Sequence, residues 1–530
     1  MRIRSRMYFI FAAKLVLIIF ACYPHQRAVE HNLTETANYT VIDHPTKVYF
    51  KDMSVAIFQN GLEIKHNIIR GRGLLYSFDR QYHKSDSIFV PLDSVVAMTY
   101  YEKYQSPGSG FANFLHGLYG IIFTPLSIYC ISCPKCCFGS CPTVYDLRDS
   151  TGLPVAELFS YNISRFFQEY DLDRLLTSPD ESQSLRLRLT NEALETHYID
   201  LFQVLKVTHP PGTAALPTPS GTIKIIDKFY PPRSAVRPDG QDITFLIRDS
   251  DTLTYRTGDK FAERVGATKP ADWLDMEFEF EAEISEFNMV FRLRNTLLTT
   301  LLFYDLVLGQ QGVEAISWTA RMQNDYFYAR LFTELYKQYG GIRFYVLHAG
   351  EWVKVAEAGD IGPIAWKDLA VPIHLPALQS HVTVRIEFFP DNILIDQVRA
   401  GLAANVIDGV PQIVPPLAIT DNRGAKRDDL IDRLATSDQE YVVTSPGEYF
   451  ELTYPPDRFT DGELTYFIRS KGYYIEWLRG DWIRNSPSDQ SMSFLNQKYV
   501  LQYISDCWQK ERPLLESAFF NSRIPLRRSP

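Results

Sequence analysis

The chain lacks an excess of basic residues. Lys and Arg together number 54 against 63 Asp and Glu, which gives a formal net charge of −9. Proteins that bind phosphate backbones depend on clustered Lys and Arg, so nucleic acid is excluded as an expected partner. Hydrophobic residues make up 45% and charged residues 22% of the chain. This balance excludes a disordered chain and a polytopic membrane protein, and it is typical of a folded soluble protein.

Familiar catalytic motifs are also missing. The sequence contains no G-x-S-x-G nucleophile motif, no phosphate-binding loop and no dinucleotide fingerprint. Gly71 and Gly73 do not form a phosphate loop, because no helix is expected after them; they suit a β-bulge or a tight bend. We therefore predict no catalytic residue and no cofactor, and the sequence favours a protein that is not an enzyme. No repeat of solenoid or propeller period is present.

The N-terminus carries an export signal. Arg2, Arg4 and Arg6 precede an apolar run over residues 7–20, and a polar stretch follows Cys22. A small residue before Cys22 resembles a bacterial lipobox, so we predict lipidation of Cys22 and a membrane anchor. Ordinary signal cleavage and an uncleaved signal anchor remain alternatives. No adjacent Arg pair marks the twin-arginine route. From the signal and Cys22 we expect export to the bacterial cell envelope, as a periplasm-facing or surface lipoprotein.

The pattern of apolar residues predicts a mainly β, multi-domain fold. Aromatic residues reach 14%, and these side chains suit pleated surfaces. Leucines alternate with arginines over residues 185–189, and Met276, Phe278 and Phe280 alternate with glutamates. Such alternation is typical of antiparallel sheets that are buried on one face only. We expect a small N-terminal β-barrel, β-sandwich-like domains with helical insertions, and a C-terminal amphipathic helix.

Turn signals and changes of periodicity divide the chain into successive parts. In the first β-rich part, Asn60-Gly61 is a strong signal for a β-hairpin turn. Residues 111–131 are almost wholly apolar, but proline and glycine weaken a spanning helix, so a buried or membrane-surface hairpin is expected. The expected parts are a signal peptide (1–22), a tether (23–45), a β-barrel-like domain (46–104), an apolar hairpin with a cysteine cluster (105–141), a β-rich domain (142–286), a helical insertion (287–340), a β-sandwich-like domain (341–485) and a C-terminal helix (490–524).

Five of the seven cysteines lie close together in the sequence. They are Cys130, Cys133, Cys136, Cys137 and Cys141. The spacing differs by one residue from the bacterial ferredoxin pattern, and no βαβ context supports a thioredoxin-like dithiol. Because exported proteins favour disulfides, we predict that these five cysteines form structural disulfides. Zinc or iron–sulfur ligation by the same residues, and thiol–redox chemistry, remain alternatives.

Two groups of charged residues are further candidates. Glu192, Glu195, His197 and Asp200 form a carboxylate–imidazole cluster, which we interpret as a network at the end of a strand rather than a catalytic pair. A segment at residues 171–174 carries two aspartates and an arginine, which we expect to cap or pair on a surface helix.

A set of aromatic residues in the second half of the chain could stack on sugars if it were exposed. We favour core packing for these side chains, because aromatics dominate β cores. The set comprises Trp352, Trp366, Tyr473, Tyr474, Trp477 and Trp482.

Three segments resemble a known group of proteins. They are residues 137–145 (Cys-Phe-Gly-Ser-Cys-Pro-Thr-Val-Tyr), 155–160 and 188–200. Together they are similar to a family of exported, often lipid-anchored, bacterial proteins with a GSCPTVY-type motif. The resemblance implies an envelope location and a β-rich body, and it implies no catalytic residue.

These observations lead to one preferred hypothesis and two alternatives. We expect an exported envelope protein, anchored by its N-terminal lipid or signal, with a binding or scaffolding role toward an envelope protein or a glycan. The first alternative is a carbohydrate-binding or glycan-processing protein. The second is a thiol–redox or metal protein that uses Cys130–Cys141.

Overall fold

A computed structural model describes most of the chain. The described residues are 25–31, 41–104, 141–176, 184–256, 272–304, 308–322, 340–404, 410–456 and 462–479, except positions 45, 53, 59, 77–81, 252, 302, 360 and 363, together with Thr333, Trp482, Trp508, Arg512, Phe519 and Leu526. Side chains are not described for residues 25–31, 82–86, 99–104, 310, 313, 314, 317 and 320–322. The chain forms two compact units: unit 1 contains residues up to Phe123, 307–330 and 478–494, and unit 2 contains the rest. The mainly β, multi-sheet prediction is confirmed.

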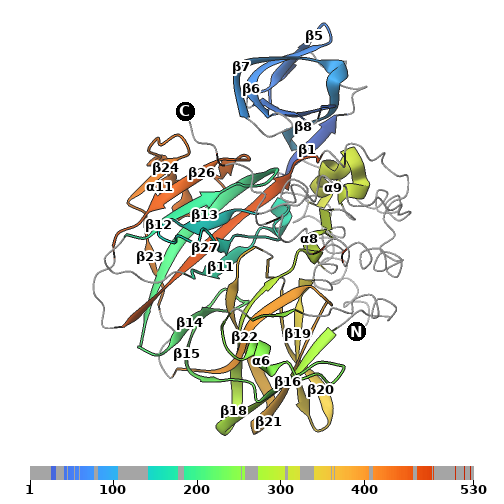
Figure 1. Cartoon of the computed structure of the whole chain (residues 1–530). Helices are drawn as coiled ribbons and strands as arrows, with labels where there is room; N and C mark the ends of the chain where they lie inside the picture. The colour runs from blue at the N-terminus through green and yellow to red at the C-terminus, as the bar shows by residue number, and fades with distance from the viewer. Residues whose placement is uncertain are drawn as a thin grey trace, which may run out of the picture. The chain divides into compact units, whose positions relative to one another are not determined.

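Unit 1 is built on one curved sheet that bends around its own apolar core (Figure 1). The strand order is β1-β8-β3-β4-β6-β5-β2, and β7 pairs with β6. Val48, Phe58 and Ile69 are fully buried in its core. The elements are β1 (His25–His31), β2 (Val41–Ile42), β3 (Thr46–Phe50), β4 (Val55–Phe58), β5 (Leu62–Lys65), β6 (Ile68–Tyr76), β7 (Tyr82–Pro91), the 3₁₀ turn η1 (Leu92–Ser94), β8 (Val95–Tyr104), η4 (Gly309–Glu314) and α9 (Ala315–Met322).

Two expectations for this part of the chain are wrong. The segment expected to be a tether contributes β1, which pairs with β8 along its whole length from His25 to His31. Backbone hydrogen bonds make this pairing, so the polar sequence gave no signal of it. The Asn60-Gly61 turn does not close a hairpin, because β4 pairs with β3 and β6 but not with β5. Instead the β5–β6 hairpin turns at His66 and Asn67, both at positive φ (52° and 60°).

The two glycines of β6 form the bulge that the sequence predicts. The register of β6 against β7 shifts between Gly71 and Gly73. A Cβ on Gly73 would lie 2.3 Å from the carbonyl oxygen of Ile57, and a Cβ on Gly71 would lie 2.5 Å from a ring carbon of Phe58. The absence of side chains therefore lets β6 bend closely over β4.

Unit 2 contains three antiparallel sheets. The first has the order β10-β9-β12-β26-β24; the second has the order β11-β27-β13-β23, with β25 paired to β13. The strands of these two sheets are β9 (Thr143–Asp146), β10 (Pro154–Glu157), β11 (Tyr170–Arg174), β12 (Arg186–Thr190), β13 (Glu195–His209), β23 (Gln412–Val414), β24 (Ala418–Asp421), β25 (Val442–Thr444), β26 (Tyr449–Thr453) and β27 (Glu463–Glu476). Short helices are η2 (Arg165–Phe167), α6 (Thr244–Ile247), α8 (Leu298–Leu301) and α11 (Asp429–Ala435).

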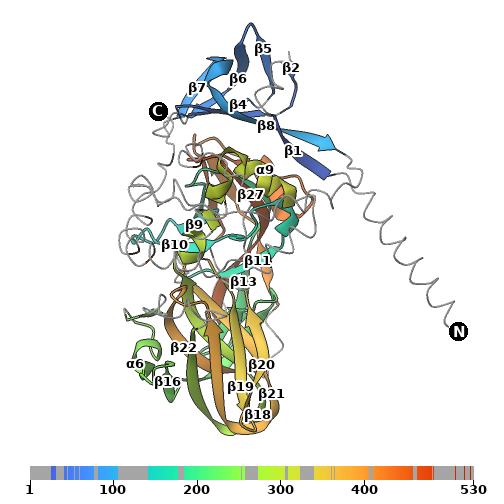
Figure 2. The same cartoon turned by 90° about the vertical axis from the view of Figure 1, so that its right-hand side faces the viewer.

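The third sheet has nine strands, and the longest of them lie side by side (Figure 2). Its central order is β14-β15-β22-β18-β21-β19-β20, with β16 paired to β18 and β17 to β22. Met276, Phe278 and Phe280 of β18 are buried in its core, as the alternation predicts. The strands are β14 (Ala214–Pro217), β15 (Ile223–Tyr230), β16 (Ser234–Val236), β17 (Tyr255–Arg256), β18 (Asp272–Asn295), β19 (Ile342–His348), β20 (Glu351–Ala358), β21 (Lys367–Phe388) and β22 (Ile393–Ala403).

The expected boundary between β-rich and helical parts does not hold. Residues 287–295, expected to begin a helical insertion, continue strand β18 to Asn295. The β-rich ranges 142–286 and 341–485 are not separate domains, because β18 pairs with β21 and β13 pairs with β27. Alternation predicts which face of a strand is buried, but it does not identify the partner strand.

Other expectations fall largely outside the described residues. This is true of the signal peptide (1–22), the apolar hairpin (111–131) and most of the C-terminal helix (490–524), where Trp508 is described and buried. Within the described residues, no helix is long and apolar enough to cross a membrane.

Replacing Gly472 by alanine is expected to destabilise unit 2. A Cβ at this position would lie 2.4 Å from the carbonyl oxygen of Tyr198 and 2.8 Å from the ring of Phe159. Because both neighbours are packed, we expect a loss of about 1–3 kcal/mol in the free energy of unfolding, measured by hydrogen exchange of β13 and β27 amides. The matched control is Gly359→Ala, since a Cβ there meets no atom within 4 Å. Equal protection in the two variants would contradict the packing argument.

Candidate functional site

The cysteine cluster contributes one described residue. Cys141 carries a free, buried thiol whose sulfur lies 3.6 Å from the carbonyl oxygen of Ser160. Burial, and then the carboxylates of Glu157, Glu195 and Glu476, raise the pKa of Cys141 well above its usual value. A thiol held in this way is a poor nucleophile. The positions of Cys22, Cys130, Cys133, Cys136 and Cys137 are outside the described residues, so their lipid, disulfide and metal roles stay predictions.

The carboxylate–imidazole cluster lies at the start of strand β13. His197 Nε2 is 3.0 Å from Glu195 Oε2, and both side chains are fully buried. Burial lowers the pKa of His197 to about 3, although the Glu476 carboxylate partly opposes this effect. Glu192 accepts a hydrogen bond from the Tyr145 hydroxyl at 3.0 Å.

Asp200 belongs to a different set of contacts. A register shift in β13 between Ile199 and Leu201 separates it from Glu195 and His197. Its carboxylate accepts hydrogen bonds from the Ser437 hydroxyl and the backbone amide of Gln439, both at 2.6 Å. The four predicted residues therefore do not form one cluster: Glu195 and His197 contact each other, while Glu192 and Asp200 each have other partners.

The aromatic residues singled out in the sequence mostly lie in the core. Tyr473, Tyr474, Trp477 and Trp482 are buried. Trp352 is half-buried, with the Arg385 guanidinium 4.2 Å from its ring centroid. Trp366 is half-buried in the same way, 5.3 Å from the Arg294 guanidinium. The core-packing interpretation is therefore confirmed for the buried four.

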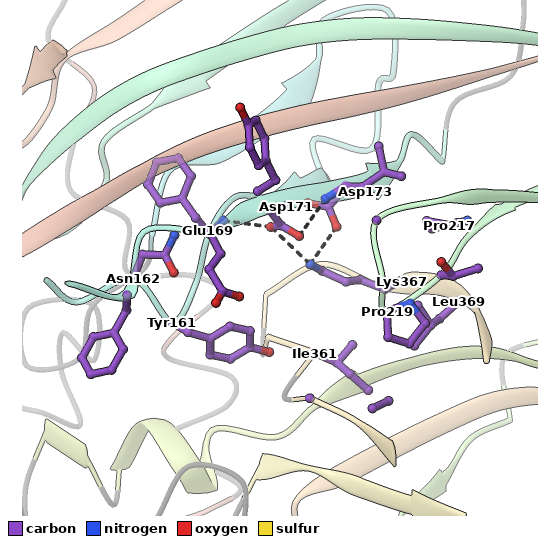
Figure 3. A pocket seen from close by; sticks show the side chains of 18 of the residues that line it. Tyr161, Asn162, Glu169, Asp171, Asp173, Pro217, Pro219, Ile361, Lys367 and Leu369 are labelled. Atoms are coloured by element: carbon purple, nitrogen blue, oxygen red, sulfur yellow. Dashed lines mark hydrogen bonds and ion pairs between the residues drawn. The ribbon is translucent and has the colours of Figure 1, made fainter. Parts of the chain in front are cut away.

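A cavity of about 460 Å³ in unit 2 brings together residues that the sequence did not connect (Figure 3). Its walls come from the loop before β11, from β11 itself, from the β14–β15 turn, and from the segment that joins β20 to β21. The lining residues are Phe159, Tyr161, Asn162, Phe166, Phe167, Glu169, Tyr170, Asp171, Leu172, Asp173, Pro217, Thr218, Pro219, Gly221, Thr333, Ala358, Gly359, Ile361, Lys367, Asp368 and Leu369.

A lysine between two aspartates forms the wall of this cavity. Asp171 and Asp173 lie two residues apart on β11, so their side chains leave the same face of the strand. Lys367, the first residue of β21, places its Nζ 2.7 Å from Asp173 Oδ1 and 3.8 Å from Asp171 Oδ2. Figure 3 shows the ammonium group reaching between the two carboxylates.

The two aspartates differ in their surroundings. Asp171 is 27% exposed and accepts hydrogen bonds from the backbone amides of Phe159 and Leu172, each at 2.9 Å. Asp173 is only 3% exposed, and its Oδ2 has no hydrogen-bond partner within the part of the chain that the structure describes. The inner carboxylate therefore keeps an acceptor position, while the outer one is already bound to the backbone.

The burial of this cluster changes its titration. Burial, and then repulsion by the Asp171 carboxylate, raise the pKa of Asp173 to about 7, although Lys367 opposes both effects. Burial alone would lower the pKa of Lys367, but attraction to Asp171 and Asp173 outweighs it and raises this pKa above its usual value. The lysine therefore stays charged, whereas Asp173 exchanges its proton near neutral pH.

Glu157, on β10, positions the loop that leads to Lys367. Its fully buried carboxylate accepts hydrogen bonds from the backbone amides of Ile364 at 2.8 Å and Ala365 at 3.4 Å. Gly362, at φ +86°, lies directly against this carboxylate, and a Cβ there would be 2.7 Å from Glu157 Oε2. The loop therefore fits closely around Glu157, and this fixes the start of β21.

A second set of ion pairs is centred on Asp368, which also lines the cavity. Asp368 pairs with Arg174 Nη1 at 2.5 Å and with Arg292 Nη1 at 3.3 Å. At the rim, Phe166 is 44% and Tyr170 is 59% exposed. The Lys471 ammonium lies 4.8 Å from the centroid of the Tyr170 ring. The cavity thus combines an apolar aromatic rim with a charged inner wall.

The sequence prediction for residues 171–174 is wrong. These residues form strand β11 and not a surface helix. The polar–apolar alternation of Tyr170-Asp-Leu-Asp-Arg174 was the available signal for a strand. Nothing in the sequence connected this segment to Lys367.

The described residues contain no group of three or more His, Cys, Asp or Glu side chains arranged to hold a metal ion.

Comparisons with known proteins add little. No protein-family model matches the chain, and no curated protein matches it. Among solved structures, a GH31 alpha-xylosidase from Xanthomonas citri is similar over 81% of this chain and 37% of that chain, with 9% identity and a TM-score of 0.15. The chain therefore spans 37% of the length of that enzyme, and a TM-score this low supports no conclusion about fold or activity.

Replacing Asp173 by asparagine is expected to change how stability depends on pH. The pKa of Asp173 is about 7 in the folded protein, above the usual value of 3.8. Between these two pH values the folded state binds more protons than the unfolded state, so ionisation of Asp173 lowers stability as pH rises from about 4 to about 7. Its contribution falls by at most about 1.4 kcal/mol per pH unit. In Asp173→Asn this contribution disappears, and denaturant unfolding across that pH range measures the difference. Identical slopes for the two proteins would contradict the assignment.

Proposed function

We propose that this protein is an exported bacterial envelope protein that binds a ligand in the cavity between β11 and β21. The observation that carries the proposal is the cavity itself, where aromatic side chains and a few converging charged groups line a concave surface. Its volume of about 460 Å³ lies within the range of sites for small organic ligands.

The contacts of the cavity favour binding over catalysis. Lys367 is held by Asp171 and Asp173, and Asp368 is held by two arginines. Groups locked in mutual ion pairs orient a ligand well, but they give up little of their charge to a reacting atom. The Cys141 thiol is buried with a raised pKa, which makes it a weak candidate for a nucleophile.

The location rests on the N-terminal sequence. A basic stretch, an apolar run and a cysteine after a small residue support export and lipidation at Cys22. The resemblance to exported, lipid-anchored bacterial proteins through the GSCPTVY motif supports the same location. A ligand-binding protein held at a membrane by lipid would meet its ligand outside the cytoplasm.

Filling the cavity is expected to remove its ligand. Gly359 lines the cavity, its φ is not in the left-handed region, and a Cβ there meets no atom within 4 Å. Gly359→Trp therefore adds a large side chain at the cavity without forcing the backbone, and Gly359→Ala is the matched control. We expect protein purified from its own envelope to carry a small molecule that native mass spectrometry detects in wild type and in Gly359→Ala but not in Gly359→Trp.

Two results would contradict the binding role. One is a wild-type protein that is purified without any bound molecule and binds none from an envelope extract. The other is a molecule that Gly359→Trp retains as well as the wild type does, because that molecule would lie elsewhere.

The anchor is tested by replacing Cys22. Without the thiol no lipid can be attached, so Cys22→Ser is expected to lose incorporation of labelled palmitate and to leave the washed membrane fraction. Wild-type protein in the same cells is the control. If Cys22→Ser stays in the membrane fraction and wild type takes up no palmitate, the uncleaved signal anchor replaces the lipid in this proposal.

A further inference from the structure

The charges of the inner cavity compensate one another. The ammonium of Lys367 lies between the carboxylates of Asp171 and Asp173, and the charge of Asp368 is met by Arg174 and Arg292. Lys367 would repel a cationic ligand, and the two aspartates would repel an anionic ligand. At the inner wall either charge would also lose its hydration, because the charged groups there are already held in ion pairs with one another. The inner wall therefore favours a ligand with no net charge.

Hydrogen-bonding capacity remains on this wall. Asp173 lines the cavity, and its Oδ2 has no hydrogen-bond partner among the described residues, but this atom has almost no accessible surface. The exposed carboxylate of Glu169, in the same lining, is the acceptor within reach of a ligand. Lys367 is 17% exposed, and an ammonium group has three protons to donate. An acceptor and a donor in the lining of one cavity suit hydroxyl groups, because each hydroxyl donates one hydrogen bond and accepts others.

The rim supplies the apolar part of the site. Phe166 and Tyr170 are both more than one-third exposed, and both line the cavity. Glu169 lies between them in the sequence and is also exposed, so its carboxylate stands at the rim. A ligand that fits must offer an apolar face to the rings and hydroxyl groups to the charged wall.

We propose that the cavity takes a neutral saccharide, with its C–H face against Phe166 and Tyr170 and its hydroxyl groups bound to Lys367 and Glu169. This inference rests on the proposed binding role and adds the class of ligand. It assigns the sugar-contacting rings to Phe166 and Tyr170, which are not among the aromatic residues of the sequence hypothesis.

The test uses the mature full-length protein and defined sugars. Isothermal titration at neutral pH compares maltose, cellobiose, lactose and mannobiose with glucosamine and glucuronate as charged analogues. We expect at least one neutral disaccharide to bind, and both charged analogues to bind at least about tenfold more weakly than it does, a difference of about 1.4 kcal/mol.

Variants assign the binding to the rim. Phe166→Ala and Tyr170→Ala are each expected to weaken binding of the neutral sugar about tenfold, since both side chains are exposed and their removal leaves the core intact. Phe245→Ala is the matched control, because Phe245 is 66% exposed on α6 and does not line the cavity. Gly359→Trp is expected to abolish binding.

The outcomes separate the ligand class from the binding role. If a charged analogue binds more tightly than every neutral sugar and Gly359→Trp abolishes that binding, the saccharide inference falls and the binding role stands. If no neutral sugar binds, the inference falls as well, and the molecule carried by the purified protein decides the binding role separately. Neutral-sugar binding that is unchanged in Phe166→Ala and Tyr170→Ala would overturn the assignment of the rim.

Discussion

The ion pairs between β11 and the start of β21 connect two sheets of unit 2. Asp171 and Asp173 belong to the sheet of β11, β27 and β13, whereas Lys367 opens a strand of the nine-stranded sheet. The pair between Arg174 and Asp368 repeats the connection one residue further along both strands. Beside these ion pairs the two sheets also pack through apolar side chains, since Leu205 and Phe467 of one sheet cluster with Ile223 and Ile225 of the other. The cavity lies next to the charged contacts. The shape of the candidate site follows from this one junction.

Buried ion pairs contribute little net stability, because the cost of removing charges from water offsets much of their attraction. Their effect is on arrangement: removing one partner leaves a buried charge without compensation, so the two strands are held in one relative position. Glu157 extends the same constraint into the loop before β21, since its carboxylate accepts hydrogen bonds from the backbone amides of Ile364 and Ala365. The position of the Lys367 ammonium is thus determined from both sides, by its aspartates and by the loop that carries it.

The amino-acid pattern was sufficient to predict the class of fold and to predict which face of many strands is buried. Leu187 and Phe278 are buried where alternation placed them, and the glycines of β6 form the expected bulge. The pairing of strands was not predictable. Alternation repeats every two residues in any strand, so it does not indicate which strand lies beside it. β13 pairs with β27 from His209↔Glu463 to Glu195↔Glu476, across much of the chain, and this pairing removes the expected boundary between two β domains.

The candidate site was harder to predict than the fold for the same physical reason. A cysteine cluster is visible because its members are neighbours in sequence, whereas Arg174 and Asp368 are 194 residues apart and meet only through the pairing of their sheets. Asp171 and Asp173 also lack any motif, since an aspartate on a short strand has the same local pattern whether it faces solvent or a lysine. A binding site made from the junction of two sheets therefore needs no recognisable sequence motif. It requires only that complementary charges lie on facing strands and that a small residue such as Gly359 leaves open space in the lining.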